Sequence, residues 1–289
     1  MNGTSTEEIS ISASDGFGLE GTLFRGAGSG PLVLICGATA VPRGYYRNFA
    51  ETLVAEHGFK AVLTFDYRGT GGYRNTSLSD RAIRMRDWAL LDIPSAFDYL
   101  KAIAPEHEIV GIGQSYGSQT LGLSGRADQY SRFVMLAPMT GYWRNFNGGW
   151  KEWLRIRVVG MPVASLIGHL PESFGLGSRL PGGVFLEWGR WCLKPEYFFD
   201  DKTLNAPAMS AAVKTPIFAI SAEDDNWGTP ASENALLKYY PNANIKRWRI
   251  DPREAGHPVG HLGFFRSRFK DTLWPVAIAW LKQGDYVAA

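Results

Sequence analysis

The stretch "IVGIGQSYGSQTLGL", Ile109 to Leu123, passes from β-branched residues and glycine into small residues that are compatible with a helix. At its centre is Gly113-Gln114-Ser115-Tyr116-Gly117, a serine between two glycines. A short run that is apolar on both faces is typical of a buried strand in a parallel sheet. Glycines beside the turn residue let the strand and the following helix approach closely, and the side chain between them is exposed above the sheet. The stretch therefore predicts a strand, a tight turn at Ser115 and a helix.

The rest of the chain repeats this alternation of strand and helix. Segments 7–14 and 19–24 alternate in polarity and are joined by "DGFG", which predicts an N-terminal hairpin. Apolar runs predict further strands at 31–37, 60–67, 108–113, 132–138, 215–221 and, more weakly, 245–250. Helical patterns lie between most of them, at 45–56, 88–103, 116–125, 232–239 and 264–281. Repeated strand–helix units predict a parallel sheet with helices on both faces.

Segment 139–213 interrupts this rhythm. It contains no strand-like run and holds half of the ten tryptophans, namely Trp143, Trp150, Trp153, Trp188 and Trp191. We expect a helical cap at 139–213, inserted into a core formed by 1–138 and 214–289. Trp150, Trp153, Leu154 and Val158 follow helical spacing, and this predicts an apolar stripe that packs inside the insertion or covers a pocket. Trp188 and Trp191 are the residues that we expect to contact a substrate.

Composition limits the class of protein. The chain has 289 residues, of which 45% are hydrophobic and 20% are charged, as in a globular enzyme-sized protein. The net charge of +2 and the lack of a Lys/Arg run argue against nucleic-acid binding. The N-terminus carries no signal-peptide pattern and no apolar run is long enough to cross a membrane, so a cytoplasmic location is expected. A homo-oligomer remains compatible with the sequence.

Metals, cofactors and disulfides are not expected. No cluster of histidines and carboxylates has the spacing of metal ligands, and no phosphate-binding loop is evident. Cys36 and Cys192 cannot form a disulfide framework, although a single bridge between them stays open. Cys36 stands at a strand end without a histidine of its own, which favours a small buried residue over a second nucleophile.

The context of Ser115 matches the G-x-S-x-G nucleophile elbow, and a surface-loop serine would not need a buried strand before it. A serine hydroxyl needs a base, and the base needs an acid that orients it. Of the five histidines, three lie in unsuitable places: His57, His107 and His169. The segment "GHPVGHLGFF" offers His261, which immediately precedes the last predicted helix and is our choice of base, with His257 as the alternative.

The acid and the oxyanion donors complete the predicted site. The loop after strand 215–221 carries Asp224, which we choose because the loop first clears the strand there, and Asp225 is the alternative. The loop after strand 132–138 offers no carboxylate nearby. The backbone N–H groups of Tyr116 and of Ala38, in the early loop "CGATAVP", are the expected oxyanion donors.

The order Ser115, Asp224, His261 and the early glycine-bearing loop resemble the α/β-hydrolase superfamily over nearly the whole chain. The resemblance implies a mostly parallel eight-stranded sheet with a helical cap insertion. The segments "CGATAVPRGYYRNFA", "LTFDYRGTG", "PGGVFLEWGRWC", "DDNW" and "GHLGFFR" are similar to bacterial serine hydrolases related to the serine-aminopeptidase and monoglyceride-lipase-like branch. Many relatives carry histidine where this chain has Cys36. The resemblance also implies that Asp66 and Arg68 fix a loop.

These residues predict a serine hydrolase that forms an acyl-enzyme on Ser115 and cleaves an ester or thioester of a small, largely apolar acyl substrate. Two alternatives remain: an acyltransferase or peptidase with the same intermediate, and a non-catalytic scaffold that binds a small molecule. A serine argues against epoxide or haloalkane hydrolysis, for which an aspartate is expected. The predicted cap holds several arginines, which could bind an anionic head group or form a solvated helix face: Arg144, Arg155, Arg157, Arg179 and Arg190.

Overall fold

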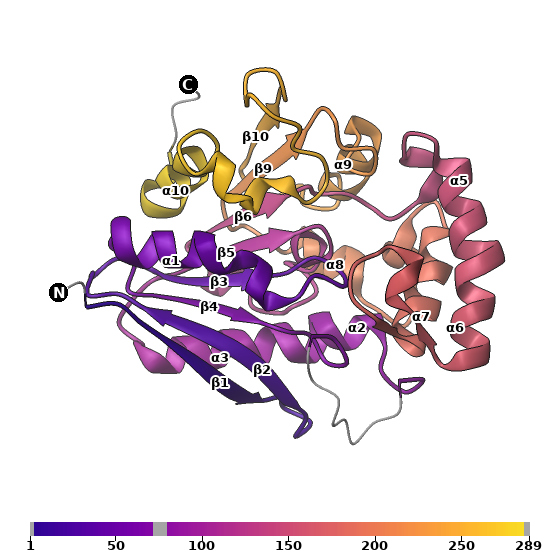
Figure 1. Ribbon diagram of the computed structural model, residues 1–289, viewed down its shortest axis with the longest axis horizontal. Coiled ribbons are helices and arrows are strands. Elements are labelled where there is room, and N and C mark those ends of the chain that lie inside the picture. Colours follow the sequence, from indigo (N-terminus) through magenta and orange to yellow (C-terminus); the bar gives the residue numbers. More distant parts are fainter. Residues whose placement is uncertain (1–2, 72–79, 286–289) are drawn as a thin grey trace.

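The computed structural model describes residues 3–71 and 80–285. A twisted eight-stranded sheet runs through the molecule in the order β1-β2-β4-β3-β5-β6-β9-β10 (Figure 1). β2 pairs antiparallel with β1 and β4, and the remaining neighbours are parallel, which confirms the predicted mostly parallel sheet. The strands are β1 (Ser5–Ser12), β2 (Gly18–Arg25), β3 (Leu32–Cys36), β4 (Ala61–Phe65), β5 (Ile109–Gln114), β6 (Arg132–Leu136), β9 (Ile217–Ala222) and β10 (Ile245–Ile250).

The central strands are apolar on both faces because two separate cores lie against the sheet. On β3, Leu32 and Leu34 belong to one core, and Val33 and Ile35 belong to the other. Helix α3 (Ile93–Ile103) packs in the first core, and helices α1 (Arg47–Glu56) and α10 (Trp274–Gln283) pack in the second, on the opposite face (Figure 1). Burying both faces removes a large apolar area from water, which is the main driving force for this arrangement.

Two predicted helices are shorter than expected. Helix α4 (Tyr116–Gln119) ends where turns begin, because the segment after it contains glycines of low helix propensity. The predicted helix at 264–281 is divided into the 3-10 turns η8 (Gly263–Phe265) and η9 (Ser267–Phe269) before α10, which starts with a proline in its first turn. Further helices are η1 (Arg43–Tyr46), α2 (Met85–Asp87), η2 (Trp88–Asp92), η3 (Ala127–Gln129) and α9 (Pro230–Leu237).

Segment 139–213 contains cap-like helices, of which α5, α6 and α7 lie together beyond one end of the sheet (Figure 1). Contrary to the expectation of no strand, it also contains a short antiparallel pair. The elements are η4 (Trp143–Asn145), α5 (Gly149–Trp153), η5 (Leu154–Gly160), α6 (Met161–Ile167), β7 (His169–Leu170), η6 (Glu172–Phe174), β8 (Leu180–Pro181), α7 (Gly182–Cys192), η7 (Tyr197–Asp200) and α8 (Ala206–Ala211).

Three of the four residues of the predicted apolar stripe face solvent and neither pack inside the insertion nor cover a pocket, whereas Trp153 is half-buried and its ring lies near that of Trp143. Trp150, Leu154 and Val158 are 59%, 40% and 53% exposed. The segment η5 is a π-helix that continues α5. Its buried residues, Ile156 and Gly160, follow the half-buried Trp153 at helical spacing, so this face of the helix turns inward.

Asp66 and Arg68 have the loop-fixing contacts that the resemblance implied. The Nε of Arg68 donates to Asp92 at 2.7 Å, and its Nη1 donates to Asp15 at 2.7 Å. Asp66 accepts the backbone N–H of Arg43 at 2.8 Å. Both cysteines are buried and unpaired, so no disulfide links them. Among the described residues no helix is long and apolar enough to span a membrane.

Candidate active site

Ser115 occupies a strained turn between β5 and α4. Its backbone angles are φ 52° and ψ −112°, in a region that non-glycine residues rarely adopt. A Cβ at Gly113 would lie 2.3 Å from the carbonyl oxygen of Gly117, and a Cβ at Gly117 would lie 2.1 Å from that of Cys36. Only glycine fits at either position, so these two residues permit the tight strand–turn–helix geometry.

Three side chains from distant parts of the sequence form one hydrogen-bonded line at this turn. The Nε2 of His261 lies 2.9 Å from the Oγ of Ser115. The Nδ1 of the same ring lies 2.7 Å from Oδ2 of Asp225. In this arrangement one ring nitrogen can accept the serine proton while the other donates to the carboxylate.

The expectation that Asp224 braces the histidine is wrong, because the alternative residue, Asp225, makes that contact. The two carboxylate oxygens of Asp224 instead accept the backbone N–H groups of Val259 and Gly260, each at 2.9 Å. Asp224 therefore holds the loop that carries His261. The reason lies in the turn: β9 continues to Ala222, and the N–H of Asp225 bonds back to the Ala222 carbonyl at 3.3 Å.

Asp225 is buried, and its carboxylate accepts several hydrogen bonds. Burial alone would raise its pKa, but the hydrogen bond and charge of His261 and the N–H groups of Gly228 and Trp227 outweigh burial and lower the pKa below its ordinary value. The N–H of Trp227 donates to Oδ1 at 2.8 Å, on the side away from the imidazole. Asp225 therefore stays ionised at neutral pH and can stabilise a positive imidazolium.

The backbone around Ser115 offers donors for an oxyanion, but not the expected pair. Tyr116 is the first residue of α4, so its N–H has no acceptor within the helix. The Ala38 N–H, which we expected to be free, donates to the Tyr46 hydroxyl at 2.8 Å. That hydroxyl in turn donates to Gln114 at 2.9 Å. The N–H of Thr39, the next residue, makes no hydrogen bond within residues 3–71 and 80–285.

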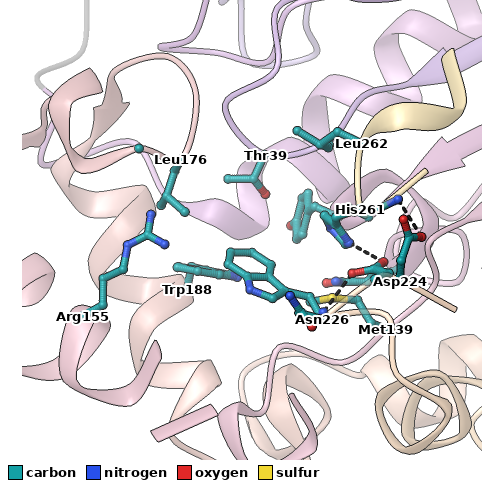
Figure 2. Close-up of a pocket in the computed structure, with 17 residues that line it drawn as sticks. Thr39, Met139, Arg155, Leu176, Trp188, Asp224, Asn226, His261 and Leu262 are labelled. Carbon is teal, nitrogen blue, oxygen red and sulfur yellow. Dashed lines mark hydrogen bonds and ion pairs between the residues drawn. The ribbon is translucent and has the colours of Figure 1, made fainter. Parts of the chain in front are cut away.

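A pocket of about 360 Å³ opens beside the Ser115 hydroxyl, between the sheet and the cap (Figure 2). Trp188 lines it as expected, and Trp191 does not. Trp191 is buried against Tyr197 and Phe198, and its Nε1 donates to Asp201 at 3.0 Å. The pocket is lined by Ala38, Thr39, Ser115, Tyr116, Gln119, Met139, Arg155, Gly175, Leu176, Trp188, Asp224, Asp225, Asn226, Trp227, Gly260, His261 and Leu262.

Several lining residues escaped the sequence prediction. Trp227 lies two residues after the acidic pair in "DDNW", and this closeness to the predicted acid could have indicated that it lines the pocket. Gln119 lies one helical turn after Ser115, is 1% exposed, and its Oε1 has no partner among the described residues. Leu176 comes from the cap, and no local pattern indicated it; Arg155 was one of the five cap arginines considered for an anionic group, but no pattern indicated that it alone of the five lines the pocket.

The alternative base, His257, is exposed, and its ring lies near Phe269 rather than in the pocket. Cys36 is buried as the last residue of β3, and burial raises the pKa of its thiol. A raised thiol pKa opposes thiolate formation, so Cys36 is poorly suited to act as a nucleophile. No group of three or more potential metal ligands is found among the described residues.

The two tryptophans should respond differently to substitution. Trp188→Ala is expected to raise KM for short acyl esters about tenfold and to favour longer chains, because the pocket widens. Trp191→Phe is expected to reduce the free energy of unfolding by about 2 kcal/mol, since it removes buried volume and the bond to Asp201. Steady-state kinetics over a series of acyl-chain lengths measure the change in KM. Denaturant-induced unfolding measures the change in the free energy of unfolding. A similar change in KM for the two variants would contradict this division.

Comparison with known proteins identifies the class of this fold and site. The model of the alpha/beta hydrolase family matches residues 32–268. The chain therefore belongs to the α/β hydrolase family. None of the curated proteins compared with it matches.

Solved structures with low sequence identity share the fold. An esterase of Pyrococcus furiosus has a TM-score of 0.62 and 17% identity, over 96% of this chain and 90% of that one. Est1E of Butyrivibrio proteoclasticus, solved with ferulic acid bound, has a TM-score of 0.59 and 16% identity, over 96% and 97%. A haloalkane dehalogenase variant from Bradyrhizobium elkanii has a TM-score of 0.61 and 15% identity, over 96% of each chain.

Proposed function

We propose that this protein is a serine hydrolase that cleaves a carboxylic ester or thioester through an acyl-enzyme on Ser115. The observation that carries the proposal is the hydrogen-bonded line from Ser115 through His261 to Asp225, at the wall of a pocket. Each of the three groups is within hydrogen-bonding distance of the next, as general-base activation of a serine requires.

In the first half of the reaction, His261 takes the proton of Ser115 as the hydroxyl oxygen attacks the acyl carbonyl. Asp225 stabilises the imidazolium that forms. The N–H of Tyr116 donates to the developing oxyanion, and we place the second donor at Thr39, because the Ala38 N–H is already bonded to Tyr46. The carbonyl then re-forms, the bond to the leaving alcohol or thiol breaks, and His261 supplies the proton that the leaving group takes.

In the second half, water attacks the acyl-enzyme. His261 accepts a proton from the water as it bonds to the acyl carbon, and the same two N–H groups stabilise the second oxyanion. The bond to Ser115 breaks, His261 returns its proton to the serine oxygen, and the acid leaves. All proton transfers use the same imidazole, so Asp225 must keep it in one orientation throughout.

The pocket wall supports a largely apolar substrate. Its apolar lining includes Met139, Leu176, Trp188, Trp227 and Leu262. The esterase and Est1E neighbours agree with ester chemistry, whereas the dehalogenase neighbour does not carry over, since a serine at the turn does not supply the aspartate expected for that reaction. An acyltransferase or peptidase would use the same acyl-enzyme. The resemblance to the serine-aminopeptidase and monoglyceride-lipase-like branch fits either outcome.

Labelling with a fluorophosphonate probe tests the proposal. Intact-mass and peptide mass spectrometry should show one adduct, on Ser115, and its formation should stop hydrolysis of p-nitrophenyl and thioester substrates. A well-folded protein that stays unmodified would support the non-catalytic scaffold instead. Product analysis in water with added alcohol or amine then distinguishes hydrolysis, which yields the free acid, from acyl transfer or peptide chemistry.

A further inference from the structure

One of the five cap arginines faces the pocket. Arg155 lies on η5 and is the only lysine or arginine that lines the pocket in the part of the chain that the structure describes. Arg179 pairs with Asp80, away from the pocket lining. The other three are exposed and contribute nothing to the lining: Arg144, Arg157 and Arg190.

The guanidinium of Arg155 is held in position before any ligand binds. Its Nη2 donates to the carbonyl of Phe174 at 2.8 Å, and its Cζ lies over the Phe174 ring, 4.8 Å from the ring centre. Its Nη1 forms an ion pair with Oε2 of Glu152, which does not line the pocket, at 3.5 Å, the outer limit of a hydrogen bond. A planar guanidinium has five N–H donors, so donors remain for a ligand after these contacts.

Charge is distributed unequally along the pocket. Figure 2 shows Arg155 at one end and His261 with Asp224 at the other, and Trp188 lies between them. Asp225 adds a second carboxylate at the His261 end. A substrate anion would be repelled at that end and attracted at the Arg155 end. The gradient therefore favours one orientation of a substrate that carries charge at one end.

We propose that the natural substrate carries a carboxylate or a similar single negative charge at the end remote from the scissile carbonyl, and that Arg155 binds this group. The inference rests on the proposed function and specifies the substrate class for the same pocket. A charge-assisted, two-pronged contact between guanidinium and carboxylate is both stronger and more directional than a neutral hydrogen bond. Arg155 is thus a specificity-determining residue, while the apolar wall holds the middle of the substrate.

Matched pairs of esters test the charge preference. The acyl-side pair is mono-p-nitrophenyl adipate or suberate and the corresponding ester with its free carboxylate methylated; these chains are too long for the carboxylate to attack its own ester readily. The leaving-group pair is the butyryl ester of 4-hydroxybenzoate and that of methyl 4-hydroxybenzoate. We expect kcat/KM to be about ten- to hundredfold higher for the charged member of one pair. The pair that shows the preference tells which side of the scissile bond carries the anion.

Variants then assign the preference to Arg155. Arg155→Gln should lower the charged-to-neutral ratio of kcat/KM about ten- to hundredfold, and Arg155→Lys, which keeps the charge but not the planar fork, should restore part of it. Arg157→Gln is the control, because it removes one exposed positive charge two residues away and should leave the ratio unchanged. Equal losses for Arg155→Gln and Arg157→Gln would overturn the proposal, since a general field would then explain the effect.

A binding measurement separates this inference from the proposed function. In a Ser115→Ala background, titration calorimetry with the charged and neutral esters should show tighter binding of the charged one, and this difference should disappear on adding Arg155→Gln. Hydrolysis without any charge preference in either pair would overturn the Arg155 proposal and leave the serine hydrolase intact. Tighter binding of the charged ester, in a wild-type protein that neither hydrolyses esters nor reacts with the fluorophosphonate, would retain the anion site and reject the hydrolase.

Discussion

Replacement of Ser115 by alanine is expected to lower kcat for p-nitrophenyl ester hydrolysis by about 10⁴- to 10⁶-fold. The reason is that the hydroxyl is the atom that bonds to the acyl carbon, and no other side chain of the pocket can take its place. Without it, His261 can activate only water, and any remaining rate comes from binding and from the oxyanion donors. Spectrophotometric assay of p-nitrophenol release, with enough protein to measure rates close to the background rate, gives the size of the loss in kcat.

Folding must be unaffected for this loss to have meaning. Within residues 3–71 and 80–285 the Ser115 side chain makes one hydrogen bond, to His261, so the thermal midpoint of Ser115→Ala should stay close to that of the wild type. Ser95→Ala provides a matched control, since its hydroxyl donates to the Leu91 carbonyl of η2 at 2.7 Å and lies outside the pocket lining. Activity of Ser115→Ala within about tenfold of the Ser95→Ala control would reject Ser115 as the nucleophile.

The turn at Ser115 could be predicted because its causes are local. Two glycines stand where a Cβ would collide with backbone, and the strand before them is apolar on both faces. The same local reasoning gave the N-terminal hairpin and the positions of the parallel strands. Patterns of this kind involve only residues that are close in sequence, so they can be recognised without knowing the rest of the fold.

What the sequence could not predict depends on geometry beyond the local pattern. The choice between Asp224 and Asp225 depends on one extra strand residue, Ala222, and on the turn that follows it. The occupation of the Ala38 N–H depends on a hydroxyl eight residues away that is itself held by Gln114. The cap helix has two sets of residues at helical spacing, and packing within the fold turns the set with Ile156 and Gly160 inward, so most of the expected apolar stripe faces water.

The second large expected effect is a loss of kcat on substitution within the acidic pair, Asp224 and Asp225. Asp225→Asn is expected to lower kcat by about 10⁴-fold, whereas Asp224→Asn should change it less than about tenfold. An amide at position 225 would present an N–H₂ group or a neutral oxygen to the imidazole, so His261 would lose the carboxylate that fixes its tautomer and balances its positive charge. Asparagine at 224 keeps one acceptor for the two N–H groups of Val259 and Gly260, and should reduce the unfolding free energy by about 1 kcal/mol.

The pH dependence of this pair distinguishes a charge effect from a packing effect. Donors around Asp225 lower its pKa below the ordinary value, so the wild-type carboxylate is ionised at neutral pH. The loss of rate in Asp225→Asn should therefore be present at neutral pH and should shrink only in acid, as the pH falls toward the lowered pKa of Asp225 and the wild-type carboxylate is protonated. If Asp224→Asn instead showed the 10⁴-fold loss, the imidazole would rely on the other carboxylate during turnover, and the hydrogen-bonded line seen in the resting site would not be the one that carries the reaction.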